Sequence, residues 1–503
     1  MAFIWVDGKK IEAKDGSLLI DVLFANNIHI PHFCYHPALG KDGNCRMCMV
    51  EIEGKKRPQI ACDTPVVDGM NIKTKGENID RVKKQILELE LINHPIDCPI
   101  CDQAGECSLQ DYYMDVGLYD SRLNTSKNRA IKRVDLGSNV VLDQERCVLC
   151  TRCVRFTKNI TKTNELGVIH RSDRSVISTF DDNPLKNPYA MNVVDLCPVG
   201  ALTSKDFRFK KRVWFLNSFE SICNKCSKGC NIYVDHSKSK YEEDKIYRYR
   251  PRYNKFINGY FICDVGRLSY KEENENTKVN TLLRGNLSEY EYANSKFLRL
   301  LKRFYSKILF LISPSLSLEE MYRICKLTKK FGANISGFDL CEYDKNFGDD
   351  FLRCNDLSTN RRALKILNIS QSKEELDKYL SIASLVVFVG REDYDLLKGF
   401  GQIENSILVN QAMPSMPDFW DLFLPYKTFA SKEGSYINID GYLQYVDAKV
   451  GYANEVSSLN EIIESCLQDG VSTCRDIWKS GLENFFDEIS FDDIVKNTPK
   501  IEL

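Results

Sequence analysis

Two short strand-like runs separated by a turn signal open the chain, Phe3 to Val6 and Lys10 to Ala13. Asp7-Gly8 stands between them, and an Asp-Gly pair flanked by strand-like residues favours a type I′ β-hairpin. The stretch from about Ser17 to Asn26 is predicted to be helical. Two strands followed by a helix are the opening of a small ferredoxin-like sheet, which is therefore expected at the front of the chain.

A longer helix is expected further along, from Asn78 as the N-cap residue to about Ile92. Its apolar positions recur with a period of 3.6 residues, the spacing of one face of an α-helix. They are Ile79, Val82, Ile86 and Leu89. Pro95 disfavours helical geometry at His94, the residue before it, so the helix is expected to end before His94.

The back half of the chain has the pattern of an α/β fold. Ser306 to Ile312 reads as a buried strand, and Ser317-Leu-Glu-Glu320 is a capping box that opens a helix. This helix is expected to carry Met321, Ile324 and Cys325 on one face. A second strand is predicted over Leu385 to Val389. Two buried strands with a helix between them indicate an open α/β sheet.

Composition limits the possible functions. A chain of 503 residues is too long for one core and should form three or more domains. A formal net charge of −1 gives no overall field that would favour nucleic acid. The apolar runs are far shorter than the roughly 20 residues that a membrane helix needs, so any membrane association is expected through partners.

Cysteine is the residue that carries the chemistry. Fifteen of the 20 cysteines lie in the first 263 residues. The N-terminal segment has no apolar core of signal-peptide length, so a reducing compartment is expected, where disulfides are rare. The other five cysteines are isolated and are interpreted as small core hydrophobes. They are Cys325, Cys341, Cys354, Cys466 and Cys474.

The first ligand set consists of Cys34, Cys45, Cys48 and Cys62. A close Cys-x2-Cys pair with a remote fourth cysteine follows the logic of plant-type [2Fe–2S] proteins, although the first gap is longer here. The Gly40 to Asn44 loop should turn backbone N–H groups toward sulfur, with the cation Arg46 nearby. A zinc site is the alternative. His32 and His36 flank Cys34 but are interpreted as structural, because the set is complete without them.

The second set follows the predicted helix and consists of His94, Cys98, Cys101 and Cys107. Only three thiolates are present, and a fourth ligand is due where His94 stands. An imidazole in place of a thiolate removes one negative charge and should raise the reduction potential of a cluster. The alternative is that His94 is a surface cap.

The third set has the most specific spacing in the chain. Cys147, Cys150 and Cys153 follow the Cys-x2-Cys-x2-Cys pattern of bacterial ferredoxins, and Cys197-Pro198 supplies the usual ending. With only one such triplet, Cys197 must close its own cluster. Four cations should bias the local field toward electron uptake. They are Arg146, Arg152, Arg155 and Lys158.

The fourth set is Cys223, Cys226, Cys230 and Cys263. Its close triplet resembles the cluster domain at the front of molybdenum-type formate dehydrogenases, which favours [4Fe–4S]. A zinc ribbon is the alternative.

Taken in order, these motifs resemble the large iron–sulfur subunit of NADH:quinone oxidoreductase, respiratory complex I, known as the 75 kDa or G subunit. The resemblance covers about residues 1–272 densely, and three phrases carry it. They are His94-Pro-Ile-Asp-Cys-Pro-Ile-Cys-Asp-Gln-Ala-Gly-Glu-Cys107, Arg146-Cys-Val-Leu-Cys-Thr-Arg-Cys153 and Asp195-Leu-Cys-Pro-Val-Gly-Ala-Leu-Thr203.

The resemblance implies one [2Fe–2S] cluster on the first set and two to three [4Fe–4S] clusters on the others, with no catalytic residue on this chain. It implies an electron relay from a flavin/NADH-binding subunit, through the Cys34, Cys147 and His94 sets, to quinone-side subunits. Because the fourth set occurs in some bacterial members and not in mitochondrial ones, a bacterial chain is expected. The expected location is the cytoplasmic side of the inner membrane, in the peripheral part of a membrane complex.

Near the end, Asp421-Leu-Phe-Leu-Pro425 and Glu433-Gly-Ser-Tyr-Ile-Asn438, with Gly441 and Gln444, resemble the degenerate molybdopterin-type domain of the family. Only about 230 residues remain for what is usually a larger unit, so a trimmed remnant without molybdenum is expected. No G-x-G-x-x-G or G-x-x-x-x-G-K-[ST] motif occurs, so neither NAD nor ATP is predicted to bind, and no flavin is expected on this chain.

The predicted fold class is therefore an α+β N-terminal region followed by an α/β, Rossmann-like domain. Five domains are expected: a 2Fe–2S β-grasp domain over 1–78, a 4Fe–4S domain with one histidine and three cysteine ligands over 79–120, a 4Fe–4S ferredoxin-like domain over 121–215, a 4Fe–4S domain of the molybdopterin-enzyme type over 216–272, and the reduced molybdopterin-oxidoreductase-like domain over 273–503.

Two other functions stay open at this point. The first three sets also suit the electron-input, diaphorase-type arm of an NAD-linked hydrogenase or a formate dehydrogenase. The tail, however, has only five dispersed cysteines and is short for a full molybdopterin domain. A zinc-stabilised scaffold without redox chemistry is the other alternative, and metal content would separate it from the rest.

Overall fold

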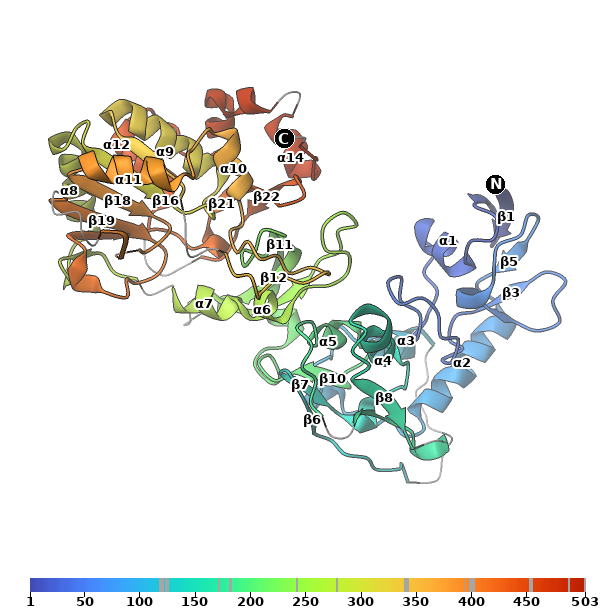
Figure 1. Ribbon diagram of the computed structural model, residues 1–503. Coiled ribbons are helices and arrows are strands. Elements are labelled where there is room, and N and C mark those ends of the chain that lie inside the picture. The colour runs from blue at the N-terminus through green and yellow to red at the C-terminus, as the bar shows by residue number, and fades with distance from the viewer. Residues whose placement is uncertain are drawn as a thin grey trace. The chain divides into compact units, whose positions relative to one another are not determined.

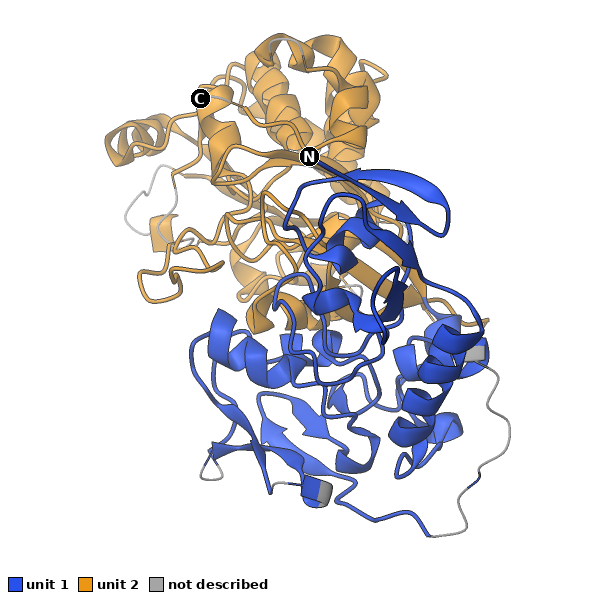
Figure 2. Cartoon of the chain, turned by 90° about the vertical axis from the view of Figure 1, so that its right-hand side faces the viewer, with its two compact units in different colours: residues 1–216 blue, residues 217–503 orange. Residues whose placement is uncertain are grey.

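The computed structural model describes the chain in two compact units, Met1–Leu216 and Asn217–Leu503, which are taken one at a time (Figure 2). The residues outside the description are 117–121, 123–125, 171, 181–182, 241–242, 277–278, 339–342, 394, 398–402, 452–455, 487–488 and 502–503. The predicted boundary at 120/121 therefore lies outside the described residues. Within the described part, no helix combines the length and apolarity required to cross a bilayer.

The first unit begins with a mixed five-stranded sheet in the order β2-β1-β5-β3-β4. Its strands are β1 (Ala2–Val6), β2 (Lys9–Ala13), β3 (Met49–Ile52), β4 (Gln59–Ile60) and β5 (Asn71–Lys73). Helix α1 (Leu19–Ala25) packs its apolar face on the sheet. Asp7 and Gly8 have φ angles of 48° and 82°, as a type I′ turn requires. The predicted hairpin and the helix after it are confirmed.

The remainder of the first unit, which contains the second and third ligand sets, consists of the long helix α2, shorter helices and short strands (Figure 1). The helices are α2 (Glu77–Leu91), α3 (Ser108–Val116), α4 (Arg152–Arg155) and α5 (Asn192–Leu196). The strands are β6 (Val134–Gly137), β7 (Val140–Leu142), β8 (Leu166–Ile169), β9 (Val176–Thr179) and β10 (Leu202–Ser204), which form the sheet β10-β7-β6 and the pair β8-β9.

The start of α2 differs from the prediction by two residues. Gly76, not Asn78, is the N-cap residue, and its φ of 134° belongs to a region that glycine adopts far more readily than asparagine. Asn78 lies in the first turn, where its side chain donates to the carboxylate of Glu51. The end of the helix near Ile92, before His94, is as predicted.

The second unit begins with an antiparallel sheet, β11 (Asn217–Ile222), β12 (Asn231–Ser237) and β13 (Lys245–Pro251), followed by α6 (Asp264–Leu268) and α7 (Tyr270–Glu275). A seven-stranded sheet then forms in the order β15-β14-β20-β19-β18-β16-β17. Its strands are β14 (Leu282–Leu283), β15 (Asn286–Leu287), β16 (Ile308–Ile312), β17 (Asn334–Ser336), β18 (Leu385–Val389), β19 (Asn405–Asn410) and β20 (Leu422–Pro425). The five strands from β20 to β17 pair in parallel, which confirms the predicted open α/β sheet.

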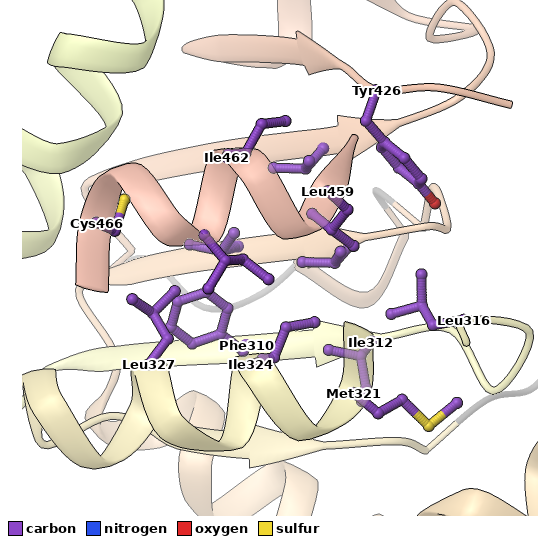
Figure 3. Close-up of a cluster of buried hydrophobic side chains, with 14 of the residues drawn as sticks. Phe310, Ile312, Leu316, Met321, Ile324, Leu327, Tyr426, Leu459, Ile462 and Cys466 are labelled. Carbon is purple, nitrogen blue, oxygen red and sulfur yellow. The ribbon is translucent and has the colours of Figure 1, made fainter. Parts of the chain in front are cut away.

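Helices cover both faces of this sheet, because alternate residues of each strand point to opposite sides. Phe310 and Ile312 of β16 belong to the core under α9 and α12, whereas Leu309 and Leu311 belong to the core under α11 (Figures 1 and 3). The remaining elements are α8 (Tyr290–Arg303), α9 (Leu318–Phe331), α10 (Arg361–Ile366), α11 (Lys373–Ile382), α12 (Leu459–Leu467), α13 (Cys474–Ile477), α14 (Phe491–Lys496) and the hairpin β21 (Glu433–Ile437) with β22 (Leu443–Asp447).

The isolated cysteines of the second unit divide into two kinds. Cys466 and Cys474 are buried in the main core, and Cys325 packs against its edge, so the interpretation as core hydrophobes holds for these three. Cys341 lies outside the described residues. Cys354 departs from the prediction and is described with the fourth ligand set below.

The capping box at the start of α9 is confirmed and is wholly buried. The Ser317 hydroxyl accepts from the Glu320 N–H at 3.2 Å, and the Glu320 carboxylate accepts from the Ser317 N–H at 2.9 Å. The same carboxylate is paired with the buried Lys432 ammonium at 2.6 Å. The cap therefore joins the helix to β21, because Lys432 directly precedes that strand.

Ser317→Ala should weaken the first turn of α9 by about 1 kcal/mol, the usual cost of losing a cap, so the N–H groups there should exchange with solvent roughly fivefold faster. Hydrogen-exchange mass spectrometry measures this. Ser458→Ala, in the exposed capping box of α12, is the matched control and should change exchange less, since water can replace its cap. Equal changes in both variants would show that burial of the Ser317 cap contributes nothing.

Candidate metal centres

The four thiols of the first set lie close together, three from the segment between α1 and β3 and one, Cys62, from just after β4. Cys34 and Cys45 have sulfur atoms 3.3 Å apart, and the Cys62 thiol hydrogen-bonds to those of Cys34 and Cys48. All four are buried. The Gly43 N–H donates to the sulfur of Cys34, so the loop turns its backbone toward sulfur as predicted. Hydrogen bonds from the neighbouring Cys45 and Cys62 thiols hold the pKa of Cys34 well below its usual range.

The two histidines beside Cys34 are held by the protein itself. His32 Nδ1 lies 2.8 Å from the carbonyl oxygen of Ile30, and His36 Nδ1 accepts from the Ala38 N–H at 3.2 Å. Burial lowers the pKa of His32 to about 4 and that of His36 to about 3, so both rings are neutral near pH 7. These contacts support the structural role expected for both residues.

The second set lies in the loop between α2 and α3. Cys98, Cys101 and Cys107 interact electrostatically in sequence, 98 with 101 and 101 with 107. Burial lowers the pKa of His94 to about 4, which leaves an imidazole lone pair free for a metal at neutral pH.

Arg146, expected to act on the third set, also faces the second set. Its guanidinium donates to both carboxylate oxygens of Asp97 at 2.9 and 2.8 Å. The resulting pair faces both His94 and Cys101. Although burial opposes it, hydrogen bonds from Arg146 and Lys132 hold the pKa of Asp97 at about 2, so the pair is charged.

The third set lines one cavity. Cys147, Cys150, Cys153 and Cys197 all face it, with apolar residues such as Leu142 and Ile177 forming other parts of the wall. Three backbone N–H groups, of Val199, Ala201 and Leu202, donate to the sulfur of Cys197. Donors aimed at thiolate sulfur favour the reduced, more negative form of an iron–sulfur cluster. Four thiols around an apolar cavity, supplied with such donors, fit a [4Fe–4S] cluster.

Two arginines join the loops of the first and third sets. Arg152 donates to the carbonyl oxygen of Tyr35 at 2.6 Å and to that of Leu196 at 3.3 Å. Tyr35 follows the first-set ligand Cys34, and Leu196 precedes the third-set ligand Cys197. Arg155 donates to the carbonyl oxygens of Cys34, Leu39 and Gly40. The Arg152 guanidinium also faces the sulfur atoms of Cys150 and Cys197.

Backbone contacts also join the loops of the second and third sets. The Ser108 N–H, next to Cys107, donates to the Pro198 carbonyl, next to Cys197, at 2.9 Å. A Cβ atom added at Gly200 would lie 2.2 Å from the sulfur of Cys101, so only glycine fits between the two loops. The third set is thus in contact with both of the others.

The fourth set is brought together in the second unit. Cys223, Cys230 and Cys263 interact with one another, and all four predicted ligands are buried. Cys263 caps α6, where its sulfur accepts from the Gly266 N–H at 3.3 Å. Gly266 also lies so close to Cys223 that an added Cβ would be 2.7 Å from its sulfur.

A fifth cysteine joins this set. The Cys354 thiol, predicted to be an isolated core residue, hydrogen-bonds to the Cys226 thiol and interacts with Cys230. Sequence reasoning missed it because it stands 91 residues beyond Cys263 with no partner at ligand spacing. In the described part of the chain, no three His, Cys, Asp or Glu side chains converge in the manner of a single-ion site.

The ligand loop of the fourth set is held by the α/β part of the same unit. Ser227 donates its N–H to the Asp356 carbonyl at 2.9 Å, and its own carbonyl accepts from the Ile439 N–H at 2.7 Å. The Gln444 side chain donates to the Gly229 carbonyl at 3.0 Å. The loop and the α/β fold therefore form one hydrogen-bonded structure.

Comparisons with known proteins match the front half. Residues 3–77 match a 2Fe-2S iron-sulfur cluster binding domain, residues 83–122 the NADH-ubiquinone oxidoreductase-G iron-sulfur binding region, and residues 137–203 the ferredoxin-like domain of NADH-quinone oxidoreductase subunit 3. The chain thus has one 2Fe–2S-binding domain and 4Fe–4S-binding domains, which confirms the predicted cofactor types and the ferredoxin-type folds of the N-terminal region.

Similar proteins bear related names. The NADH-quinone oxidoreductase G subunit of Rickettsia conorii is 36% identical over 334 residues, 65% of this chain and 49% of the relative. The NADH-ubiquinone oxidoreductase 75 kDa subunit of Reclinomonas americana is 40% identical over 270 residues, 54% of this chain and 38% of the relative. The chain spans about half the length of such relatives, or less. A solved NAD+-reducing [NiFe]-hydrogenase is 28% identical, with a TM-score of 0.39, over 42% of this chain and 91% of that chain.

His94→Cys should leave a cluster on the second set but lower its midpoint potential, because a thiolate adds one negative charge where the imidazole is neutral. Potentiometric titration followed by EPR measures the shift. His36→Gln is the control and should leave the potential of this cluster unchanged. An unchanged potential in His94→Cys would refute ligation by His94.

Arg152→Gln should lower the midpoint potential of the third cluster by on the order of 50 mV, because it removes a buried cation that faces Cys150 and Cys197. Arg152→Lys keeps the charge but loses the forked hydrogen bonds, so its shift should be smaller. The same EPR titration measures both variants. Equal shifts would mean that the hydrogen bonds, and not the charge, set the potential.

Proposed function

We propose that this chain, a homologue of the G subunits of NADH-quinone oxidoreductases, is an iron–sulfur electron relay that carries electrons from an NADH/flavin-binding subunit toward quinone. The observation that carries the proposal is the contact of three ligand sets within one unit: the third set touches the first through Arg152 and the second through Ser108 and Pro198. Cofactors bring the redox chemistry, and the protein positions them and adjusts their potentials.

The same contacts support the assignment of cluster ligands. Cys34, Cys45, Cys48 and Cys62 would hold the [2Fe–2S] cluster, and the sets beginning at His94 and Cys147 a [4Fe–4S] cluster each. Cys223, Cys226, Cys230 and Cys263 would hold a further [4Fe–4S] cluster. The third set has backbone contacts with both the first and the second, which supports an electron path in the order Cys34 set, Cys147 set, His94 set.

The fourth set has a structural role in this proposal. Its ligand loop is hydrogen-bonded to Asp356, Ile439 and Gln444 of the α/β fold, so a bound cluster would fasten the sheet β11-β12-β13 to that fold. We infer that the α/β part is a reduced molybdopterin-oxidoreductase-like domain that binds no molybdenum. Its open parallel sheet with helices on both faces supports this inference.

The proposal also includes partner subunits and a location. The chain would lie in the peripheral part of a membrane complex, on the cytoplasmic side, between a flavin subunit and quinone-side subunits. The electron-input arm of an NAD-linked hydrogenase or formate dehydrogenase is the second candidate, since its first three ligand sets would be the same. In that case the chain would co-purify with a catalytic subunit of that class instead of with membrane subunits.

Anaerobically purified protein should contain about 14 irons per chain with matching acid-labile sulfide, the content of one two-iron and three four-iron clusters. Iron, zinc and sulfide analysis measures this directly. EPR during stepwise reduction should add one signal for each cluster. About ten irons would show that the fourth set holds no cluster, and zinc without sulfide would end the relay proposal.

A further inference from the structure

Five thiols, rather than four, meet at the fourth ligand set. Cys354 lies between β17 and α10, in a segment that folds back on itself: the Asp344 N–H donates to the Asn355 carbonyl at 2.9 Å, and Tyr343 pairs with Asp356. The Ser227 N–H then donates to the Asp356 carbonyl at 2.9 Å. Two backbone-paired segments therefore carry Cys226 and Cys354 side by side.

The rest of this segment also faces the ligand set. Asp349 and Arg353 interact electrostatically with Cys263, and Arg353 donates to Asp349 at 3.1 Å. Phe351 packs on Phe261, two residues before Cys263, with ring centroids 6.0 Å apart. The segment from 349 to 354 thus covers the fourth set, and Cys354 is held there by several contacts.

Cys226 and Cys354 form a pair that differs from the other thiols of the set. Cys354 hydrogen-bonds to Cys226, whereas Cys223, Cys230 and Cys263 interact chiefly among themselves. A [4Fe–4S] cluster takes one thiolate at each of its four irons. Among the described thiols, three corners would therefore have one candidate ligand each, and the fourth corner would have two.

We propose that Cys354 is an alternative cluster ligand that can replace Cys226 at its iron. The inference rests on the proposed fourth cluster and adds Cys354 to its candidate ligands. In the exchange, Cys354 loses its thiol proton and binds the iron, while Cys226 leaves the iron and takes up a proton. One iron–sulfur bond forms and one breaks, no electron moves, and the charge of the site is unchanged.

The test compares single and double variants of the whole chain, purified anaerobically. Cys226→Ala should keep the [4Fe–4S] cluster and about 14 irons, because Cys354 takes the vacant corner. Cys354→Ala should also keep it. The double variant should lose the [4Fe–4S] signal, with conversion to [3Fe–4S] or complete loss, and its iron should fall to between about 10 and 13 per chain.

Cys223→Ala is the matched control, since no spare thiol among the described residues lies beside that corner. It should lose the [4Fe–4S] form in the single variant. Cys226→Ala combined with Cys325→Ala, a thiol at the edge of the main core, should behave as Cys226→Ala alone. The EPR signals of the first three clusters, which belong to the other unit, report in every variant whether that unit has folded and is loaded.

Three results would overturn the inference. Cys226→Ala could lose the cluster as fully as Cys223→Ala, the double variant could keep it, or wild-type protein could carry a Cys226–Cys354 disulfide, which would consume both thiols. A wild-type content of about ten irons is a separate failure, because it removes the fourth cluster from the proposed function and the inference with it.

Discussion

Burial of the thiols is the constraint on which the site depends. Burial raises the pKa of Cys150 and of Cys223 to about 12 and that of Cys107 to about 11, so without a metal these side chains stay protonated at neutral pH. A metal binds thiolates, so loading the sites must release these protons. The free energy of iron–sulfur bonding then has to exceed the cost of forming thiolates in an apolar interior. N–H donors and arginines reduce that cost.

Backbone geometry supplies the donors where side chains do not. Leu149 and Thr151 have φ angles of 48° and 60°, uncommon for residues with a Cβ, and they alternate with the third-set cysteines. The Leu149 N–H donates to the sulfur of Cys147 at 3.4 Å. This loop of the third ligand set therefore accepts backbone strain of the kind seen at functional sites, and the surrounding packed elements maintain it.

Local patterns predicted those parts of the fold that depend on neighbouring residues. Asp7-Gly8 made the turn, and Ser317 with Glu320 made the cap, because each of these interactions closes within four residues. The close cysteine triplets were predictable for the same reason. Cys354 was not, since its proximity to Cys226 depends on a segment that pairs with the ligand loop across more than a hundred residues. The N-cap at Gly76 was missed because asparagine is a preferred N-cap residue, whereas the φ angle of Gly76 is set by the fold.

The sequence showed where the arginines stand in the chain, but not which groups their side chains contact. Arg146, Arg152 and Arg155 lie within ten residues, yet they point to Asp97, to the Tyr35 and Leu196 carbonyls, and to the Cys34 loop. Each guanidinium offsets the negative potential of carbonyl or carboxylate oxygens, which would otherwise disfavour an added electron near a bound cluster. One short segment around the third set thus adjusts the surroundings of all three sets of its unit. A charge change within this segment is therefore expected to affect neighbouring potentials together, which would couple the steps of the proposed relay.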